Sequence, residues 1–331
     1  YRLYYPSTKV SEMAKSGDSL FICVKQDDTI LCIVAAKDAT ITSQLYWLFD
    51  ITDNKAGKFT QNSLLNTDSG QLEFLARTIL EQIGIAYEED DSKGLLAELI
   101  GEFGNSFPKT TLFSSFARSL VKDVDPISEP DVALLKWFDM DEKLFFLMEE
   151  NIVKERLQQG FVENGEVNVK MFINFSLSVQ NRRKSRAGYS LENHICALLD
   201  ANGIEYSHTP VTENRSKPDF LFPNIECYRN MDFNAENLTM LGAKSTCKDR
   251  WRQVLAEADR IDRKHLLTLE AAISTYQTDE MQDKHLQLVV PQQIHCTYTE
   301  NQRQWLYSVA DFLDEIKEKQ RKTPYAAMLR L

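Results

Sequence analysis

Residues 217–223, Lys-Pro-Asp-Phe-Leu-Phe-Pro, and residues 241–246, Leu-Gly-Ala-Lys-Ser-Thr, are short apolar segments that place Asp219 and Lys244 on strand-like runs. A proline before Asp219 suits the first position of a strand, where no ladder donor is needed. Further strand-like segments occupy residues 204–207, 265–269 and 286–290, and helix-like segments occupy residues 190–201, 236–240, 249–263 and 301–319. This alternation predicts an α/β domain with a central mixed sheet flanked by helices.

The chain upstream of this domain has a different character. Residues 95–178 read almost entirely as helix, whereas residues 1–95 contain strand-like segments at 2–5, 19–25 and 29–36 and helix-like segments at 42–49 and 71–85. The acidic run at residues 88–91 is polar and turn-like, as at a domain boundary. We therefore predict a β-rich domain over residues 1–95, a second domain over residues 96–320 with a helical subregion (96–180) and an α/β core (181–320), and a solvated tail over residues 321–331.

Composition argues against several classes of protein. The chain has 331 residues, of which 43% are hydrophobic and 26% charged, which is typical of a folded protein of two domains. No apolar run approaches the roughly 18 residues that span a bilayer, so we expect no membrane partner. The six cysteines have no CxxC pairing, which predicts reduced thiols in a cytoplasmic protein. The net charge of −11 argues at first against a nucleic-acid partner.

Motifs for nucleotide binding, serine hydrolysis and zinc proteolysis are absent, and a group of carboxylates and a lysine remains as the candidate for chemistry. On the helix expected at residues 249–263, Arg250, Gln253 and Glu257 share one face. Glu257 can therefore converge with Asp219 and Lys244 on one site. The alternative is that Asp219 caps a turn and that Lys244 and Glu257 form an ordinary surface pair.

Such a group suits metal-dependent hydrolysis of a phosphodiester bond. Two carboxylates bind a hard cation such as Mg²⁺ through oxygen, and the metal polarises the phosphate and lowers the pKa of an attacking water. A lysine beside them neutralises the negative charge that develops on the phosphorus centre.

Two basic clusters flank these residues. Residues 181–188, Asn-Arg-Arg-Lys-Ser-Arg-Ala-Gly, hold four cations and no acid, and we expect them to form a loop before a helix that carries Glu192. The triplet Lys248-Asp249-Arg250 follows the Lys244 strand and combines residue types that read G·C pairs in the major groove. The alternatives are a solvated loop for the first cluster and, for the second, a helix start at which Asp249 complements the helix dipole.

Taken together, these segments resemble the EcoRII type of restriction endonuclease, a branch of the PD-(D/E)XK nuclease superfamily. The resemblance rests on residues 181–188, on Lys217-Pro-Asp-Phe-Leu-Phe-Pro223, on Thr246-Cys-Lys-Asp-Arg-Trp-Arg-Gln253, on Glu257-Ala-Asp259 and on Leu288-Val-Val-Pro291. It extends more weakly from about residue 107 to residue 313. The resemblance implies a restriction-endonuclease-like fold for the α/β core.

The resemblance also assigns roles to individual residues. It implies a catalytic core of Asp219, Lys244 and Glu257, with Tyr228 near the active site and with Asp219, Glu257 and Glu192 as the metal-binding acids. The superfamily usually places an acid two residues before the lysine, where this chain has Gly242, and the following helix supplies the missing carboxylate. For DNA, it implies that Lys248, Asp249 and Arg250 read outer CC/GG base pairs and that a loop with Arg182, Arg183, Lys184 and Arg186 lines the duplex.

The resemblance predicts a Mg²⁺-dependent type II endonuclease that cuts double-stranded DNA at a palindromic site as a homodimer. Two alternatives are a catalytically silent DNA-binding protein and a nuclease that is gated by effector DNA or another ligand at the N-terminal domain. Residues 1–95 resemble, faintly, the second half of the B3-like β-barrel that forms the effector-DNA domain of this type of enzyme. The first half of that barrel is missing from the sequence.

The distribution of charge removes the first objection to DNA. Residues 181–264, which hold every residue named for chemistry or DNA contact, contain 14 Lys and Arg against 12 Asp and Glu. The rest of the chain carries 24 against 37, so the acidity belongs mainly to the helical and N-terminal parts. This pattern predicts one basic cleft in an acidic exterior.

Overall fold

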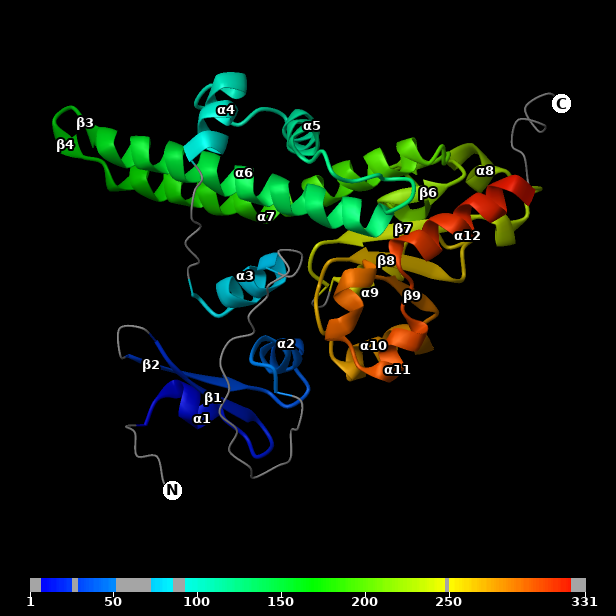
Figure 1. Cartoon of the computed structure of the whole chain (residues 1–331), viewed down its shortest axis with the longest axis horizontal. Coiled ribbons are helices and arrows are strands. Elements are labelled where there is room, and N and C mark those ends of the chain that lie inside the picture. The colour runs from blue at the N-terminus through cyan, green and yellow to red at the C-terminus, as the bar shows by residue number, and fades with distance from the viewer. Residues whose placement is uncertain (1–6, 26–28, 52–72, 86–92, 248–249, 323–331) are drawn as a thin grey trace.

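The protein is described from a computed structural model that covers residues 7–25, 29–51, 73–85, 93–247 and 250–322. Figure 1 shows a small N-terminal lobe, a pair of long helices and a sheet with shorter helices around it. The strand expected at residues 2–5, the hairpin turn at Asp27-Asp28, the acidic run at 88–91, the pair Lys248-Asp249 and the tail after residue 322 lie outside the described residues.

The core of the larger part is a five-stranded sheet in the order β5-β6-β7-β8-β9. Its strands are β5 (Ser207–His208), β6 (Phe220–Phe222), β7 (Thr239–Lys244), β8 (Lys264–Thr268) and β9 (Leu286–Val289). The pairs β5·β6 and β6·β7 are antiparallel, and β7·β8 and β8·β9 are parallel. The predicted mixed sheet is therefore confirmed, and its strands lie within a few residues of those expected.

Helices cover both faces of the parallel strands, so these strands are buried in the core (Figure 1). Every residue of β8 and β9 is buried, including His265 and Gln287. Gly242 in β7 allows a close approach on one face: a Cβ atom there would lie 2.8 Å from a methyl group of Val254, on the short helix α9 (Trp251–Val254). Val254 of α9 thus packs against the backbone of Gly242, at the position where the superfamily usually has an acid, and leaves no room for a side chain there.

Two long antiparallel helices, α6 (Pro130–Gln159) and α7 (Val169–Ala201), run side by side from the sheet to a small hairpin of β3 (Val162–Glu163) and β4 (Glu166–Val167) (Figure 1). The expectation of a basic loop at residues 181–188 is wrong, because these residues lie inside α7. The helix continues through them because several of the cations contact acids and aromatic rings of the neighbouring α6, as described below.

The helices after β7 also differ from the sequence prediction. The helix expected at residues 249–263 is reduced to the four residues of α9, and turns follow it, with Ala258 in the left-handed region at a φ of 51°. The helix expected at 301–319 consists of α11 (Glu300–Trp305) and α12 (Val309–Lys322), because Tyr307 between them pairs with β9. Helices α8 (Ile225–Arg229) and α10 (Thr275–Asp283) and the 3-10 turn η2 (Ala235–Asn237) complete this region.

Asp131, in the first turn of α6, joins distant parts of the larger core. Its side chain is buried, and its two carboxylate oxygens accept hydrogen bonds from the backbone N–H groups of Gln292 (2.9 Å), Val309 (2.8 Å) and Ala310 (3.0 Å). Two of these donors are at the start of α12, whose first turn has no intrahelical acceptors for its N–H groups. One carboxylate therefore caps α12 and ties it to α6 and to the 3-10 segment η3 (Gln292–Thr297).

The N-terminal lobe contains the predicted hairpin, β1 (Ser19–Val24) with β2 (Ile30–Ala35), and the helices α1 (Lys9–Met13), α2 (Thr40–Leu48) and α3 (Glu73–Gln82). It has a small core of its own, formed by Phe21, Ala35, Leu45, Leu48 and Ile79. The helices α4 (Lys93–Phe103) and α5 (Thr110–Leu120) pack against the long helices. Within the described ranges, no helix is long and apolar enough to cross a membrane.

Polar contacts dock this lobe on the larger part. The Thr40 hydroxyl donates to the side-chain oxygen of Gln277 (2.8 Å), the Gln44 amide donates to the Ala271 carbonyl (3.1 Å), and the Arg77 guanidinium lies 2.8 Å from the Asp139 carboxylate. Leu75 of α3 also belongs to the main hydrophobic core. The lobe is thus held by both polar and apolar contacts.

Candidate active site

Asp219 and Lys244 form the centre of the candidate site. Asp219 immediately precedes β6, and Lys244 is the last residue of the neighbouring β7. The Lys244 ammonium donates to Asp219 Oδ2 at 2.6 Å, and the same oxygen accepts the backbone N–H of Ala243 at 2.7 Å. Both side chains are mostly buried, with exposed fractions of 13% for Asp219 and 17% for Lys244. Strand pairing thus fixes a carboxylate and a cation in contact at the sheet edge.

Glu257 lies beside this pair, although it is on no helix. It follows α9 in an irregular segment, and its Oε2 atom is buried and has no hydrogen-bond partner among the described residues. Burial, and then the negative charge of Asp219, raise the pKa of Glu257 to about 7, against the opposing effect of Lys244 and Lys264. The structure therefore brings Asp219, Lys244 and Glu257 together, as the sequence predicts, through a different local backbone.

This arrangement fits a divalent cation. The negative charge of Asp219 disfavours that of Glu257, and a buried carboxylate oxygen without a hydrogen bond is costly, so a cation bound by both would satisfy both. No three His, Cys, Asp or Glu side chains in the described ranges are close enough to form a metal site by themselves. Asp219 and Glu257 would hold Mg²⁺ as two protein ligands, and Mg²⁺ commonly keeps water or phosphate oxygens in its other positions.

Glu192 does not join this group directly. It lies on α7, and its carboxylate is 3.0 Å from Nε2 of His208 in β5. The His208 ring stacks on Phe220, the residue after Asp219, with ring centroids 5.0 Å apart. In this structure Glu192 is therefore paired with His208 and not with Asp219 or Lys244.

Tyr228 is close to Glu257 in the fold but faces away from solvent. It is 2% exposed, and its hydroxyl donates to the Glu213 carboxylate at 2.7 and 2.8 Å. The backbone N–H of Arg260 donates to the same hydroxyl oxygen at 3.3 Å. Burial, and then the hydrogen bond to Glu213, raises the pKa of Tyr228 to about 12. The hydroxyl is thus occupied by protein groups on both sides.

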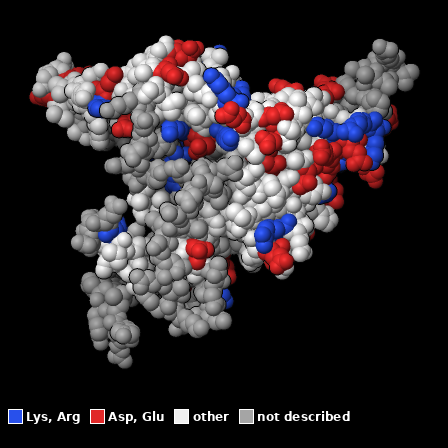
Figure 2. All heavy atoms as spheres, in the orientation of Figure 1, with Lys and Arg blue, Asp and Glu red and all other residues white. Residues whose placement is uncertain are grey.

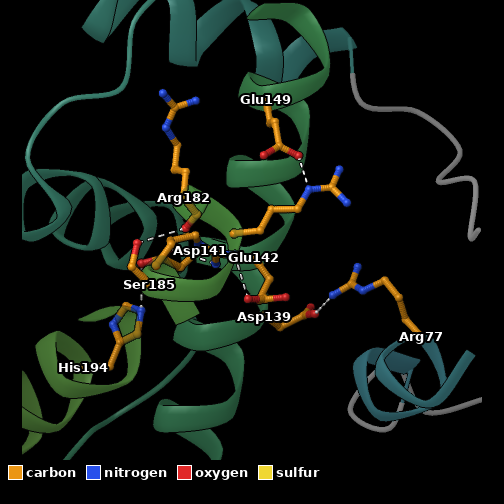
Figure 3. A network of polar contacts seen from close by, with 10 residues as sticks. Arg77, Asp139, Asp141, Glu142, Glu149, Arg182, Ser185 and His194 are labelled. Atoms are coloured by element: carbon orange, nitrogen blue, oxygen red, sulfur yellow. Dashed lines mark hydrogen bonds and ion pairs between the residues drawn. The ribbon is translucent and has the colours of Figure 1, made fainter. Parts of the chain in front are cut away.

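The cations of α7 have two different environments (Figure 3). Arg186 is buried, with its guanidinium 3.2 Å from Asp141, 2.7 Å from Glu142 and over the ring of Phe145, so it fastens α7 to α6. Arg183 contacts Glu149, but its own side chain is 56% exposed.

Arg182 and Lys184 lie on the solvent side of the same stretch of α7. The Arg182 guanidinium lies over the Phe107 ring, 4.8 Å from its centroid, and Lys184 is exposed. Of the four predicted DNA contacts on α7, Arg182, Arg183 and Lys184 therefore reach the surface, and Arg186 does not.

Arg250 is the one described member of the predicted base-reading triplet. It is exposed and directly precedes α9, and its guanidinium donates to the carbonyl and to the hydroxyl of Thr246 at 2.8 and 3.0 Å. Thr246 follows β7 by two residues, so Arg250 lies on the same side of the sheet edge as Lys244. The position of Arg250 relative to the strand is thus fixed by its own loop.

The sequence prediction missed three residues next to the site: Glu213, Arg260 and Lys264. Lys264 begins β8 and is 8% exposed, and its ammonium donates to the Ile261 carbonyl at 2.6 Å. Burial lowers the pKa of Lys264, and the nearby acids Asp259, Asp262 and Glu257 oppose that shift. No spacing rule points to Arg260, because the segment from 255 to 263 has no regular secondary structure, and Glu213 and Lys264 lie outside the helix expected at residues 249–263.

The raised pKa of Glu257 predicts a stability change in the metal-free protein. A carboxyl whose pKa is higher in the folded than in the unfolded state destabilises the fold above that pKa and has no such effect well below the unfolded value. We therefore expect Glu257→Gln to raise the melting temperature at pH 8 in EDTA and to change it much less at pH 5. Thermal unfolding followed by circular dichroism measures both. Equal shifts at the two pH values would contradict the assigned pKa.

Known proteins are similar to this chain in sequence and in fold. The family model described as EcoRII C terminal matches residues 145–313, just over half of the chain. The type II restriction enzyme EcoRII of Escherichia coli is 36% identical over 268 residues, which are 81% of this chain and 62% of the relative. The chain thus spans less than two thirds of the length of that enzyme.

Two solved structures share the fold. Metal-depleted Ecl18kI in complex with uncleaved, modified DNA superposes with a TM-score of 0.55 at 19% identity, and its complex with uncleaved DNA gives 0.54 at 18%. Each match covers 70% of this chain and 85% of the other. The matched family segment includes Asp219, Lys244 and Glu257, the side chains that converge at the sheet edge. This chain therefore belongs to the family defined by the C-terminal domain of EcoRII.

Proposed function

We propose that this protein is a type II restriction endonuclease that hydrolyses double-stranded DNA with Mg²⁺ at a short palindromic site with outer CC/GG pairs. The observation that carries the proposal is the contact of Lys244 with Asp219 beside a buried Glu257 whose Oε2 has no partner in the described structure. Membership of the EcoRII C-terminal family supports the reaction class, and the DNA in the two Ecl18kI structures supports the substrate class.

The residues of the site divide the work of hydrolysis. Asp219 and Glu257 would hold Mg²⁺, which when bound polarises the phosphate and lowers the pKa of a water molecule. Lys244 donates to a non-bridging phosphate oxygen and stabilises the charge that builds up there. Glu192 would complete the acidic set, after its carboxylate leaves His208. Tyr228 supports the structure of the site from its buried side, since its hydroxyl donates to Glu213.

DNA contact falls to exposed cations near the same sheet edge. We propose that Arg182, Arg183 and Lys184 contact phosphates, where each cation adds affinity without reading sequence. Lys248, Asp249 and Arg250 would read the outer base pairs through the major groove, because Arg and Lys pair with guanine O6 and N7 and Asp accepts from cytosine N4. Two copies related by a two-fold axis would cut the two strands of a palindrome.

Sequencing of cleaved DNA ends tests this function most directly. Purified protein is incubated with Mg²⁺ and a plasmid or phage genome, beside an Asp219→Asn variant, and the ends are read by run-off sequencing. We expect the wild-type ends to fall at one short sequence with outer CC/GG pairs and the variant to leave the DNA intact. Cutting at the same rate by both proteins, or ends without a common sequence, would rule the proposal out.

Gating by the N-terminal lobe is a second possibility that one observation favours. A pocket of about 220 Å³ lies between the two parts, and its walls include Gln44 and Leu75 of the lobe as well as Arg183, Arg186 and Thr246 of the larger part. The docked lobe therefore stands close to the segment that follows Lys244. An effector that releases the lobe would change access to that segment.

Loosening the lobe tests this gating. We expect the double substitution Gln44→Ala and Arg77→Ala to raise the cleavage rate about tenfold, because removing contacts that hold a closed state shifts its population by the energy of those contacts. Rates under single-turnover conditions measure the effect. Lys9→Ala, an exposed change on the same lobe, serves as the control. A rate unchanged by the double substitution in a folded protein would argue against gating.

A further inference from the structure

The position of Glu257 needs an explanation, because no regular element supports it. The segment from Leu255 to Arg263 consists of turns. Ala258, directly after Glu257, has a left-handed φ, which residues other than glycine rarely adopt. Such a backbone persists only when its surroundings determine it. Arg260 supplies several of the contacts that hold this segment to its surroundings.

Arg260 binds the segment to the chain that follows α8. Its guanidinium donates to the carbonyls of Asn230 and Phe233 at 3.0 Å each, and to the carbonyl of Tyr228 by a shorter contact. The same guanidinium lies over the Tyr228 ring, 5.6 Å from its centroid. Arginine suits this task because its planar group carries five donors in a fixed arrangement. One side chain thus holds three carbonyls of a neighbouring loop.

Tyr228 extends the connection to the segment that leads into Asp219. Its hydroxyl donates to Glu213 and accepts the Arg260 N–H. Glu213 begins the 3-10 turn η1 (Glu213–Arg215), six residues before Asp219. Glu213, Tyr228 and Arg260 therefore form a continuous chain of contacts. One end of it precedes Asp219, and the other end follows Glu257. This chain of contacts therefore links the segment before Asp219 to the segment after Glu257 and helps to fix the positions of the two carboxylates.

We propose that Arg260 is a positioning residue that sets the Glu257 carboxylate opposite Asp219 and Lys244, with Tyr228 and Glu213 as its supports. The inference rests on the proposed function, since the two acids are there to hold a metal. Arg260 reaches neither acid itself, and its contacts are with carbonyls and with Tyr228. Its loss would remove the contacts that hold the turn after Glu257 to Tyr228, Asn230 and Phe233, and metal affinity would fall while DNA contact stays intact.

The test compares Arg260→Ala with Arg263→Ala. Arg263 is a matched control three residues along, whose guanidinium contacts Glu315 and Gln287 on the far side of β8. Mn²⁺ binding to the DNA-free protein is measured by isothermal titration calorimetry, single-turnover cleavage with saturating DNA gives the rate, and DNA affinity is measured in Ca²⁺. We expect Arg260→Ala to weaken Mn²⁺ binding about tenfold and to slow cleavage by about a hundredfold, as for other residues that orient metal ligands. DNA affinity, and all three values for Arg263→Ala, should stay at the wild-type level.

Conservative variants keep the inference falsifiable if Arg260→Ala does not fold. Lysine at position 260 can reach one carbonyl instead of three, so Arg260→Lys should recover part of the Mn²⁺ affinity. Tyr228→Phe keeps the ring and removes the hydroxyl link, so it should weaken Mn²⁺ binding in the same direction by a smaller factor.

The outcomes separate this inference from the proposed function. Wild-type Mn²⁺ affinity and rate in folded Arg260→Ala, or in Tyr228→Phe where Arg260→Ala does not fold, would overturn the positioning role, and so would equal losses in the Arg263→Ala control. A loss of DNA affinity equal to the loss of rate would make Arg260 a DNA contact and would also overturn it. If the wild-type protein cuts no DNA and Arg260→Ala still loses Mn²⁺ affinity, the proposed function fails and the positioning role stands.

Discussion

Replacement of Lys244 by methionine is expected to slow single-turnover DNA cleavage by about a thousandfold, the loss found when a charge-stabilising donor is removed from a reaction centre. The Lys244 ammonium lies 2.6 Å from Asp219 at the end of β7, and methionine keeps most of the side-chain volume. Mn²⁺ binding should be retained or tightened, because a positive charge beside the two acids is lost. The rate and the metal affinity should therefore change in different ways.

Lys217→Met is the control for this substitution. Lys217 is an exposed lysine two residues before Asp219, on the same segment, and the structure gives it no place in the site. We expect its rate to stay within a factor of two or three of the wild-type rate, as for surface changes in general. A Lys244→Met rate that is within tenfold of the wild-type rate would remove Lys244 from the mechanism.

The second large effect is expected from Asp131→Ala. This change removes the acceptor of three backbone N–H groups: that of Val309, which is buried, and those of Gln292 and Ala310, whose hydrogen bonds to Asp131 are partly buried. Each unsatisfied group costs about 1–3 kcal/mol, so we expect the free energy of unfolding to fall by about 3 kcal/mol or more. Urea unfolding followed by tryptophan fluorescence measures this difference.

Asp125→Ala provides the comparison for Asp131. Asp125 also accepts a backbone N–H, that of Ile127 at 3.0 Å, but it is exposed and its contacts are local. Its removal should cost less than about 1 kcal/mol, because water replaces the lost acceptor. Similar losses for the two substitutions would show that Asp131 does not join α6 to α12 as described.

The sheet and its chemistry were predictable because they depend on local pattern. The buried strands β8 and β9 are short segments that together have leucine or valine at most positions, and Asp219 and Lys244 stand at the ends of β6 and β7, which are neighbours in sequence, so their contact follows once those strands pair. Glu257 also lies beside this pair as expected, although it lies in an irregular segment after α9 and not on the helix expected at residues 249–263.

Two elements were not predictable, and both depend on contacts between distant residues. The cations of residues 182–186 resemble a solvated loop until α6 supplies Glu149, Asp141 and Glu142, more than thirty residues away. The apolar spacing of Trp251, Val254, Ala258 and Ile261 indicates a helix, and all four are indeed buried. In this segment the Arg260 guanidinium donates hydrogen bonds to carbonyls at and near Tyr228, and the chain forms turns in place of a helix. The periodicity of the sequence does not predict these contacts.

The continuity of α7 acts as a molecular ruler. Arg183 and Glu192 are nine residues apart on one helix, which fixes them about 14 Å from each other at 1.5 Å per residue. In a flexible loop, a cation could follow the DNA backbone wherever it ran. On a rigid helix, a phosphate held by Arg183, as we propose, would stand at a fixed distance along the helix from Glu192. The spacing of residues along a single helix would then determine which phosphodiester bond is cut.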